Sequence, residues 1–105
     1  MPDACPTHGR READAARRSF LKPAEWEAFK ARFVTAEGRV VDSGNGDMSH
    51  SEGQGFAMVL ATAFDDPGAF LALWRWARTM LQVRDDALLA WAWRPEAGEV
   101  TDRNN

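Results

Sequence analysis

The spacing of hydrophobic side chains predicts two amphipathic helices in this chain. The first covers residues 24–36, where large apolar side chains recur at intervals of three and four residues, at Trp26, Phe29 and Phe33. The second covers residues 67–81, where apolar side chains recur at helical spacing, at Phe70, Leu73, Trp74, Ala77 and Leu81. Asp66 is suited to cap this helix at its N-terminus, and Pro67 to occupy its first position.

Between these two helices, residues 51–64 are apolar nearly all round. A helix without a polar face is typical of a protein interior, because other elements must cover it on several sides. Two or three residues separate it from the helix over 67–81, which predicts an antiparallel helical hairpin. After the hairpin the period changes to two, with Leu89, Trp91 and Trp93 in alternation, and this indicates a short extended segment.

Composition and charge limit the possible partners. The 105 residues carry 13 Lys and Arg against 16 Asp and Glu, a net charge of −3, which argues against a nucleic acid or an anionic membrane. No apolar run approaches the roughly 18–20 residues that span a bilayer. One cysteine cannot form an internal disulfide, and two histidines cannot build a His/Cys zinc site. We therefore expect no metal and no cofactor.

The first 23 residues differ in composition from the rest. They hold five basic and three acidic side chains, a net charge of +2 that leaves −5 for the remainder, and three of the five prolines. This composition predicts a basic, disordered arm over residues 1–23 and an ordered portion over residues 24–105. A short amphipathic helix over residues 14–21 is the alternative. Cys5 lies in this arm with no catalytic signature around it.

The most unusual stretch is Ser-His-Ser-Glu-Gly-Gln-Gly-Phe, from Ser49 to Phe56. One interpretation is structural: Ser49 and Glu52 have the spacing of a capping box, in which each side chain binds the other's backbone N–H. The other is catalytic, because partial burial at the mouth of an apolar helix raises a carboxyl pKa toward the range of a general acid. The positive helix N-terminus acts in the opposite direction, and the sequence leaves this contest open.

The tryptophans are a second candidate feature, since the chain has five Trp and no Tyr. Trp91 and Trp93 stand two apart in the extended segment, so we expect both indoles on one face. Flat rings with a polar N–H edge suit the apolar faces of pyranose sugars. The alternative is a place in the core, which we favour for Trp26, Trp74 and Trp76 and leave open for Trp91.

Other candidate groups form no recognisable site. The hydroxyl groups beside His50 are its direct neighbours in sequence, which disfavours a nucleophile–base pair, and no carboxylate is evident to orient the ring. The preceding glycine-rich loop holds three oxygen-bearing side chains, at Asp42, Asn45 and Asp47, but they miss the register of a calcium-binding EF-hand. We favour a plain turn over residues 43–47.

Four blocks of this sequence, taken in order, resemble glycoside hydrolase family 8. They are residues 26–34 with residues 37–42, then residues 51–58, which read Ser-Glu-Gly-Gln-Gly-Phe-Ala-Met, then residues 88–93, and finally Asp102-Arg103-Asn104. The second block is similar to the family signature in which Ser-Glu-Gly opens a buried helix. The resemblance covers nearly everything outside the basic arm. Within the family, the sequence is most similar in style to the endoglucanases of bacterial cellulose synthesis.

The resemblance implies an all-α fold: the N-terminal part of an (α/α)6 barrel built from helical hairpins. It implies endo-acting hydrolysis of β-1,4-glucan with inversion, Glu52 as the proton donor and Trp91 as a sugar-stacking residue. The implied partner is a β-1,4-linked polysaccharide or oligosaccharide, the implied protein is monomeric, and the implied location is secreted or periplasmic, although no signal peptide is visible. Phe56 replaces the tyrosine usual in the family, and the catalytic base is expected beyond Asn105.

The resemblance leaves two other functions open. The chain could be a non-catalytic helical module that binds carbohydrate or a partner, or a helical bundle without a role in sugar chemistry. If the base lies outside the chain, we expect these 105 residues alone to be inactive.

Overall fold

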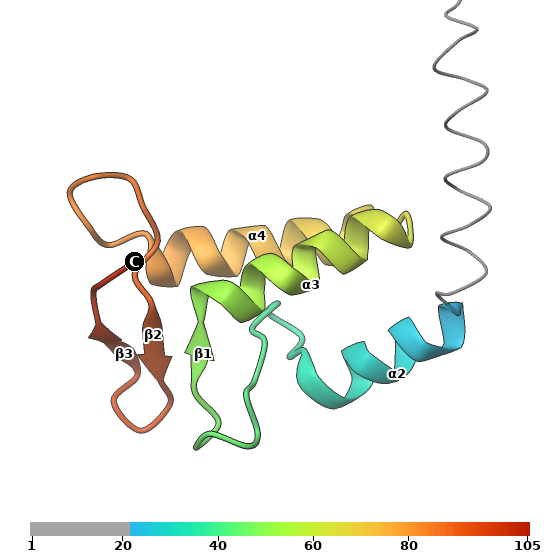
Figure 1. Ribbon diagram of the computed structural model, residues 1–105, viewed down its shortest axis with the longest axis horizontal. Helices are drawn as coiled ribbons and strands as arrows, with labels where there is room; N and C mark the ends of the chain where they lie inside the picture. The colour runs from blue at the N-terminus through green and yellow to red at the C-terminus, as the bar shows by residue number, and fades with distance from the viewer. Residues whose placement is uncertain (1–21) are drawn as a thin grey trace, which may run out of the picture.

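Helices α3 (Ser51–Ala63) and α4 (Pro67–Leu81) form the antiparallel hairpin that the sequence predicts (Figure 1). The computed structural model describes residues 22–105, so most of the predicted basic arm, with Cys5, lies outside the described residues. Asp66 caps α4 by accepting a hydrogen bond from the backbone N–H of Ala69, with Pro67 in the first turn, as predicted. No helix within residues 22–105 is long and apolar enough to cross a membrane.

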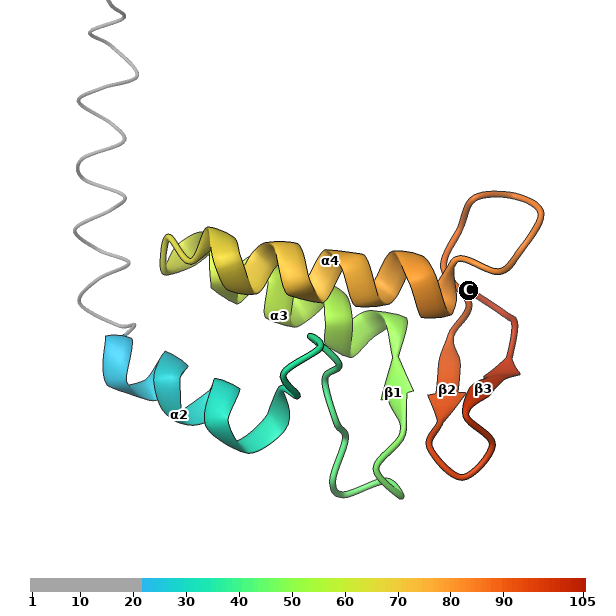
Figure 2. The same ribbon diagram turned by 180° about the vertical axis from the view of Figure 1, so that it is seen from behind.

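Helix α2 (Pro23–Phe33) lies against the turn that joins α3 to α4 (Figure 2). It starts with a proline, as the sequence suggests, but ends three residues earlier than predicted, because Val34 leaves the helix and pairs with Val40. Gly38 makes this reversal possible. Its φ is +95°, and a Cβ there would lie 2.2 Å from the carbonyl oxygen of Ala72 in α4.

The first core cluster joins α2 to the hairpin. Trp26 is 3% exposed and stacks on Phe64 at 5.8 Å between ring centroids, while Ala57 and Ala61 on α3 are fully buried against Leu73 of α4. Small side chains at these α3 positions allow the two helices to approach closely. Trp26 is therefore a core residue, as expected.

The sequence predicts that α3 is covered on several sides, and residues 22–105 supply only part of that cover. Gln54, a polar residue, is fully buried on its inner face. Phe56 and Val59 are 60% and 65% exposed on another face. Helix α4 and the loop after α2 therefore cover only part of α3.

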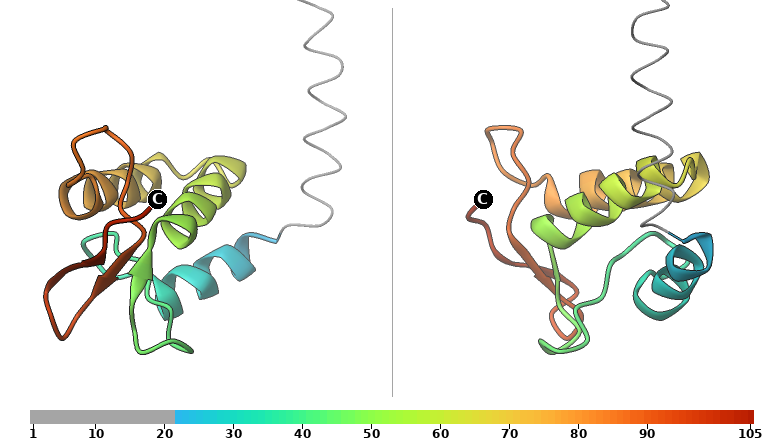
Figure 3. Two further views of the ribbon diagram at one scale, coloured as in Figure 1. Left: turned by 60° about the vertical axis from the view of Figure 1, so that its left-hand side comes forward. Right: turned by 45° about the vertical axis from the view of Figure 1, so that its right-hand side comes forward.

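A small antiparallel sheet, which the sequence did not predict as a sheet, packs beside the N-terminus of α3 and the C-terminus of α4 (Figure 3). Its strand order is β1 (Ser49–His50), β2 (Ala92–Arg94) and β3 (Glu99–Asp102). The predicted extended segment is confirmed in β2 alone. Trp93 of β2 meets Trp76 edge to face at 5.4 Å in a second core cluster with Ala77 and Leu81.

Candidate active site

Glu52 stands in the first turn of α3, directly after strand β1. The sheet fixes this position, because the backbone N–H of Ser51 donates to the carbonyl of Trp91 at 3.0 Å. The side chain of Glu52 is exposed. The helix therefore begins at the sheet, and the carboxylate of Glu52 is exposed at the N-terminus of the helix.

The two residues that the sequence singled out meet here. The indole Nε1–H of Trp91 donates to Glu52 Oε1 at 2.9 Å, although 39 positions separate them. Trp91 is half-buried, so part of its ring remains accessible. The expected pairing of Trp91 with Trp93 as one platform is not what the contacts show: Trp93 instead packs on Trp76 and under the guanidinium of Arg39.

An open hollow of about 550 Å³ lies in front of this pair. Its lining contains two carboxylates, an indole, a hydroxyl and two amide groups, contributed by Ser51, Glu52, Trp91, Asp102, Asn104 and Asn105. The amide of Asn105 is held by a hydrogen bond to the carbonyl of Leu89 at 2.8 Å. Such a surface offers donors and acceptors for sugar hydroxyls beside an aromatic face for a sugar ring.

The predicted capping box of Ser49 and Glu52 is wrong. Ser49 belongs to β1 and is fully buried, and its hydroxyl donates to the carbonyl of Val40 at 2.5 Å. The N-cap of α3 is His50, whose Nδ1 accepts from the backbone N–H of Gly53 at 3.0 Å. This change frees the Glu52 side chain from a capping role.

His50 also has the carboxylate partner that the sequence did not reveal. Its Nε2 lies 3.2 Å from Asp42 Oδ2, and its ring stacks on Trp91 at 6.0 Å between centroids with 11° between the planes. Asp42 reaches this position because it pairs with Met48 across the loop. Recognising the loop over residues 43–47 as a hairpin turn would have placed the two side chains together.

Gln54 is a second residue that sequence reasoning missed. Its side-chain Oε1 accepts from the backbone N–H of Val40 at 2.6 Å, and its Nε2 donates to the carbonyls of Gly38 and Leu73 at 3.0 and 3.1 Å. A buried amide satisfied on three sides ties the loop after α2 to both helices of the hairpin. A polar side chain inside a helix that is otherwise largely apolar was its signal.

The described part of the chain holds no cluster of His, Cys, Asp and Glu able to bind a metal ion. Residues 43–47 form turns, as predicted from their composition.

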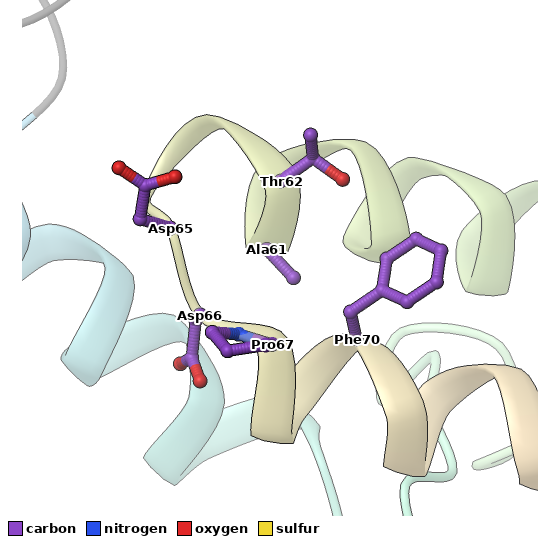
Figure 4. A pocket seen from close by; sticks show the side chains of 6 residues that line it. All are labelled: Ala61, Thr62, Asp65, Asp66, Pro67 and Phe70. Atoms are coloured by element: carbon purple, nitrogen blue, oxygen red, sulfur yellow. The ribbon is translucent and has the colours of Figure 1, made fainter.

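A second hollow, of about 480 Å³, lies at the far end of the hairpin from Glu52 (Figure 4). Its lining is largely apolar: Ala61, Thr62, Asp65, Asp66, Pro67 and Phe70. The carboxylate of Asp66 accepts hydrogen bonds there from the indole of Trp26 and from the ammonium of Lys30, whose Nζ lies 2.6 Å from Oδ2. The ammonium of Lys30, then the indole of Trp26 and the backbone N–H of Ala69, lower the pKa of Asp66 to about 2. This carboxylate therefore serves the fold.

Comparison of this fold with solved structures identifies the class of protein to which the chain belongs. The chain superposes on a family 8 endoglucanase from Klebsiella pneumoniae with a TM-score of 0.73 and 46% identity, covering 76% of this chain and 26% of that one. The hairpin is thus part of an (α/α)6 barrel, as the resemblance implied. A sequence model described as Glycosyl hydrolases family 8 matches residues 4–105, and the chain belongs to that family.

Curated relatives agree with this assignment. An endoglucanase from Cellulomonas uda is 44% identical over 81 residues, which are 76% of this chain and 23% of that protein. A probable endoglucanase from Novacetimonas hansenii is 44% identical over 82 residues, which are 77% of this chain and 24% of that protein. The chain thus spans about a quarter of the length of the relatives it matches.

Proposed function

We propose that this chain supplies the general acid and one wall of the substrate cleft of an endo-β-1,4-glucanase. The observation that carries the proposal is the contact between Trp91 and Glu52 at the edge of the polar hollow. It is supported by relatives that are named endoglucanases and are 44% identical to this chain. The proposed substrate is a β-1,4-linked glucan, and the proposed location of the protein is secreted or periplasmic.

In this proposal Glu52 protonates the oxygen of the scissile glycosidic bond. The indole N–H of Trp91 holds Oε1, and Oε2 has no hydrogen-bond partner within residues 22–105, so it is the oxygen available to carry the proton. The exposed part of the Trp91 ring stacks on a sugar next to the bond. Positioning of this kind lowers the activation barrier because the acid and the leaving oxygen are already oriented, so less entropy is lost on reaching the transition state.

The reaction inverts the anomeric centre, with water activated by a carboxylate base. Inversion requires the two carboxyl groups to be roughly 6.5–9.5 Å apart so that water fits between base and sugar. We assign the base to another part of the catalytic domain, and we do not give this role to Asp102. The 105 residues alone are therefore expected to release no reducing sugar.

The test is Glu52→Gln in the complete catalytic domain. The variant keeps the size of the side chain but cannot donate a proton as an acid, so kcat on carboxymethylcellulose should fall by about 10²–10⁴-fold. Glu96→Gln, in the exposed turn between β2 and β3, is the matched control and should retain the wild-type rate. Equal rates for the two variants, with melting temperatures unchanged, would contradict the assignment.

The second candidate is a module that binds β-glucan without cleaving it, which the open hollow and the accessible Trp91 ring also suit. Calorimetry with cello-oligosaccharides separates the two. A catalytic domain releases reducing sugar and loses that activity in Glu52→Gln while still binding. A binding module shows affinity with no release in either form.

A further inference from the structure

We propose that His50, oriented by Asp42, is the positioning residue for both Glu52 and Trp91. The inference rests on the proposed function, since it assumes that these two residues act on the sugar. The imidazole has two tasks at once: it caps the helix that carries Glu52, and it forms the surface on which the Trp91 indole stacks.

The hydrogen bonds of His50 define its tautomer. The backbone N–H of Gly53 is a donor, so Nδ1, at 3.0 Å, must be unprotonated to accept from it. The proton of the neutral ring then lies on Nε2 and is donated to Asp42 Oδ2 at 3.2 Å. Asp42 thereby selects the tautomer that can cap the helix.

The cap acts on the turn that holds the acid. Gly53 is the third residue of α3, and Glu52 is the second. Loss of a side-chain cap frees the first turn of a helix, which would let the Glu52 carboxylate leave its position. The identity of residue 53 agrees with this arrangement: a Cβ there would lie 3.1 Å from His50 Cε1 and 3.3 Å from Nδ1, so the seated ring leaves room for glycine alone without a shift.

The stacking contact acts on the tryptophan. The two rings are nearly parallel at 6.0 Å between centroids, and the same indole donates to Glu52. The backbone of Trp91 is fixed independently, since its carbonyl accepts from Ser51 N–H. Imidazole, indole and carboxylate therefore form one contiguous set, and a displacement of the imidazole reaches Glu52 by two routes, the helix cap and the indole.

This arrangement differs from ordinary capping in a way that can be measured. Asparagine is among the strongest N-cap residues but has no aromatic face. His50→Asn should restore the cap and not the stack, whereas His50→Ala removes both. A merely structural cap would make His50→Asn equivalent to wild type in every respect.

The first experiment compares these variants in the complete catalytic domain with cello-oligosaccharides. For His50→Ala we expect kcat to fall by about tenfold or more and KM to rise. For His50→Asn we expect kcat to recover toward wild type while KM stays raised. Full recovery of both parameters in His50→Asn, or no change of either in His50→Ala, would overturn the proposal.

The second experiment reads the tautomer without activity. In ¹⁵N NMR of the imidazole, assigned from the signal lost in His50→Asn, the wild type should show protonated Nε2 and unprotonated Nδ1. Asp42→Ala removes the carboxylate that accepts from Nε2–H and should lower the population of the Nε2–H tautomer, with kcat reduced as for a lost cap. Asp47→Asn, in the same loop at a φ of +59° where Asn is equally suited, is the control and should change neither.

The outcomes separate the two proposals. An Nδ1–H signal in the wild type, or an unchanged tautomer population in Asp42→Ala, contradicts the positioning role whatever Glu52 does. If the tautomer behaves as expected but Glu52→Gln retains full activity, the proposed function fails and the geometry of His50 stands.

Discussion

Within residues 22–105, two tryptophan–carboxylate hydrogen bonds have the same length but opposite surroundings. Trp26 donates its indole N–H to Asp66, and Trp91 donates its indole N–H to Glu52, each at 2.9 Å. Asp66 also accepts from Lys30 at 2.6 Å and from a backbone N–H. Within residues 22–105, no Lys or Arg forms an ion pair with Glu52.

The difference shows what separates a structural carboxylate from a candidate acid. Asp66 is surrounded by donors, one of them cationic, which keep it ionised and tie α2 to the hairpin. Glu52 has one donor and faces an open hollow. The indole contact alone is therefore compatible with either role, and the cation and the exposure decide between them.

The largest expected effect is on kcat, and it distinguishes Glu52 from Asp66 through substrates that differ in their leaving group. Glu52→Gln should lose about 10²–10⁴-fold in kcat on carboxymethylcellulose but far less on a dinitrophenyl cello-oligosaccharide, because dinitrophenolate departs without protonation. Asp66→Asn should leave kcat unchanged on both substrates. Steady-state kinetics on the complete domain checks this. An equal loss on both substrates in Glu52→Gln would indicate a positional defect and not a lost acid.

The second comparison concerns the tryptophans themselves. Trp26 is 3% exposed in the first core cluster, so Trp26→Ala should lower the free energy of unfolding by about 3–5 kcal/mol, measured by urea denaturation. Trp91 is half-buried at the hollow, so Trp91→Ala should cost less stability and raise KM for cello-oligosaccharides. Unaltered KM would return Trp91 to a purely structural role, and unaltered stability in Trp26→Ala would contradict the core assignment.

Local signals in the sequence predicted the helices well and their ends unevenly. The bounds of α4 agree with the prediction because Asp66 and Pro67 are adjacent to the helix that they start. The end of α2 was missed because Val34 pairs with Val40, a contact set by the loop and not by helix propensity. The sheet was missed because its strands are only two to four residues long, and because β1 pairs with β2 across the whole helical hairpin.

The site shows the same limit. Glu52 and Trp91 were both selected from the sequence, but their contact joins residues 39 positions apart and no periodicity could predict it. His50 was dismissed for want of a carboxylate, because nothing local indicated that Asp42 returns beside it through pairing with Met48. Residue types could thus be chosen from a family signature, while the partners that orient them required the fold.

The smallest expected effect is the contribution of Asp66 to the pH dependence of stability. Its pKa falls from 3.8 to about 2 on folding, chiefly through Lys30, so its ionised form stabilises the fold above about pH 4. A shift of this size corresponds to about 2 kcal/mol. This contribution is lost as pH falls from about 4 to 2, because the folded state then takes up the proton that the unfolded state has already bound.

Asp66→Asn is the variant that measures this contribution. Its single side-chain oxygen can accept from Trp26 or from Ala69, which bind different oxygens of Asp66, so it removes the charge and one hydrogen bond. The difference in free energy of unfolding between wild type and Asp66→Asn should be about 2 kcal/mol larger at pH 6 than at about pH 2, because the contribution of the charge is lost over this range. In a Lys30→Met background the difference should be smaller at pH 6, because the main cause of the lowered pKa is gone. A difference that stays constant with pH would show that Asp66 stabilises the turn by its hydrogen bonds and not by its charge.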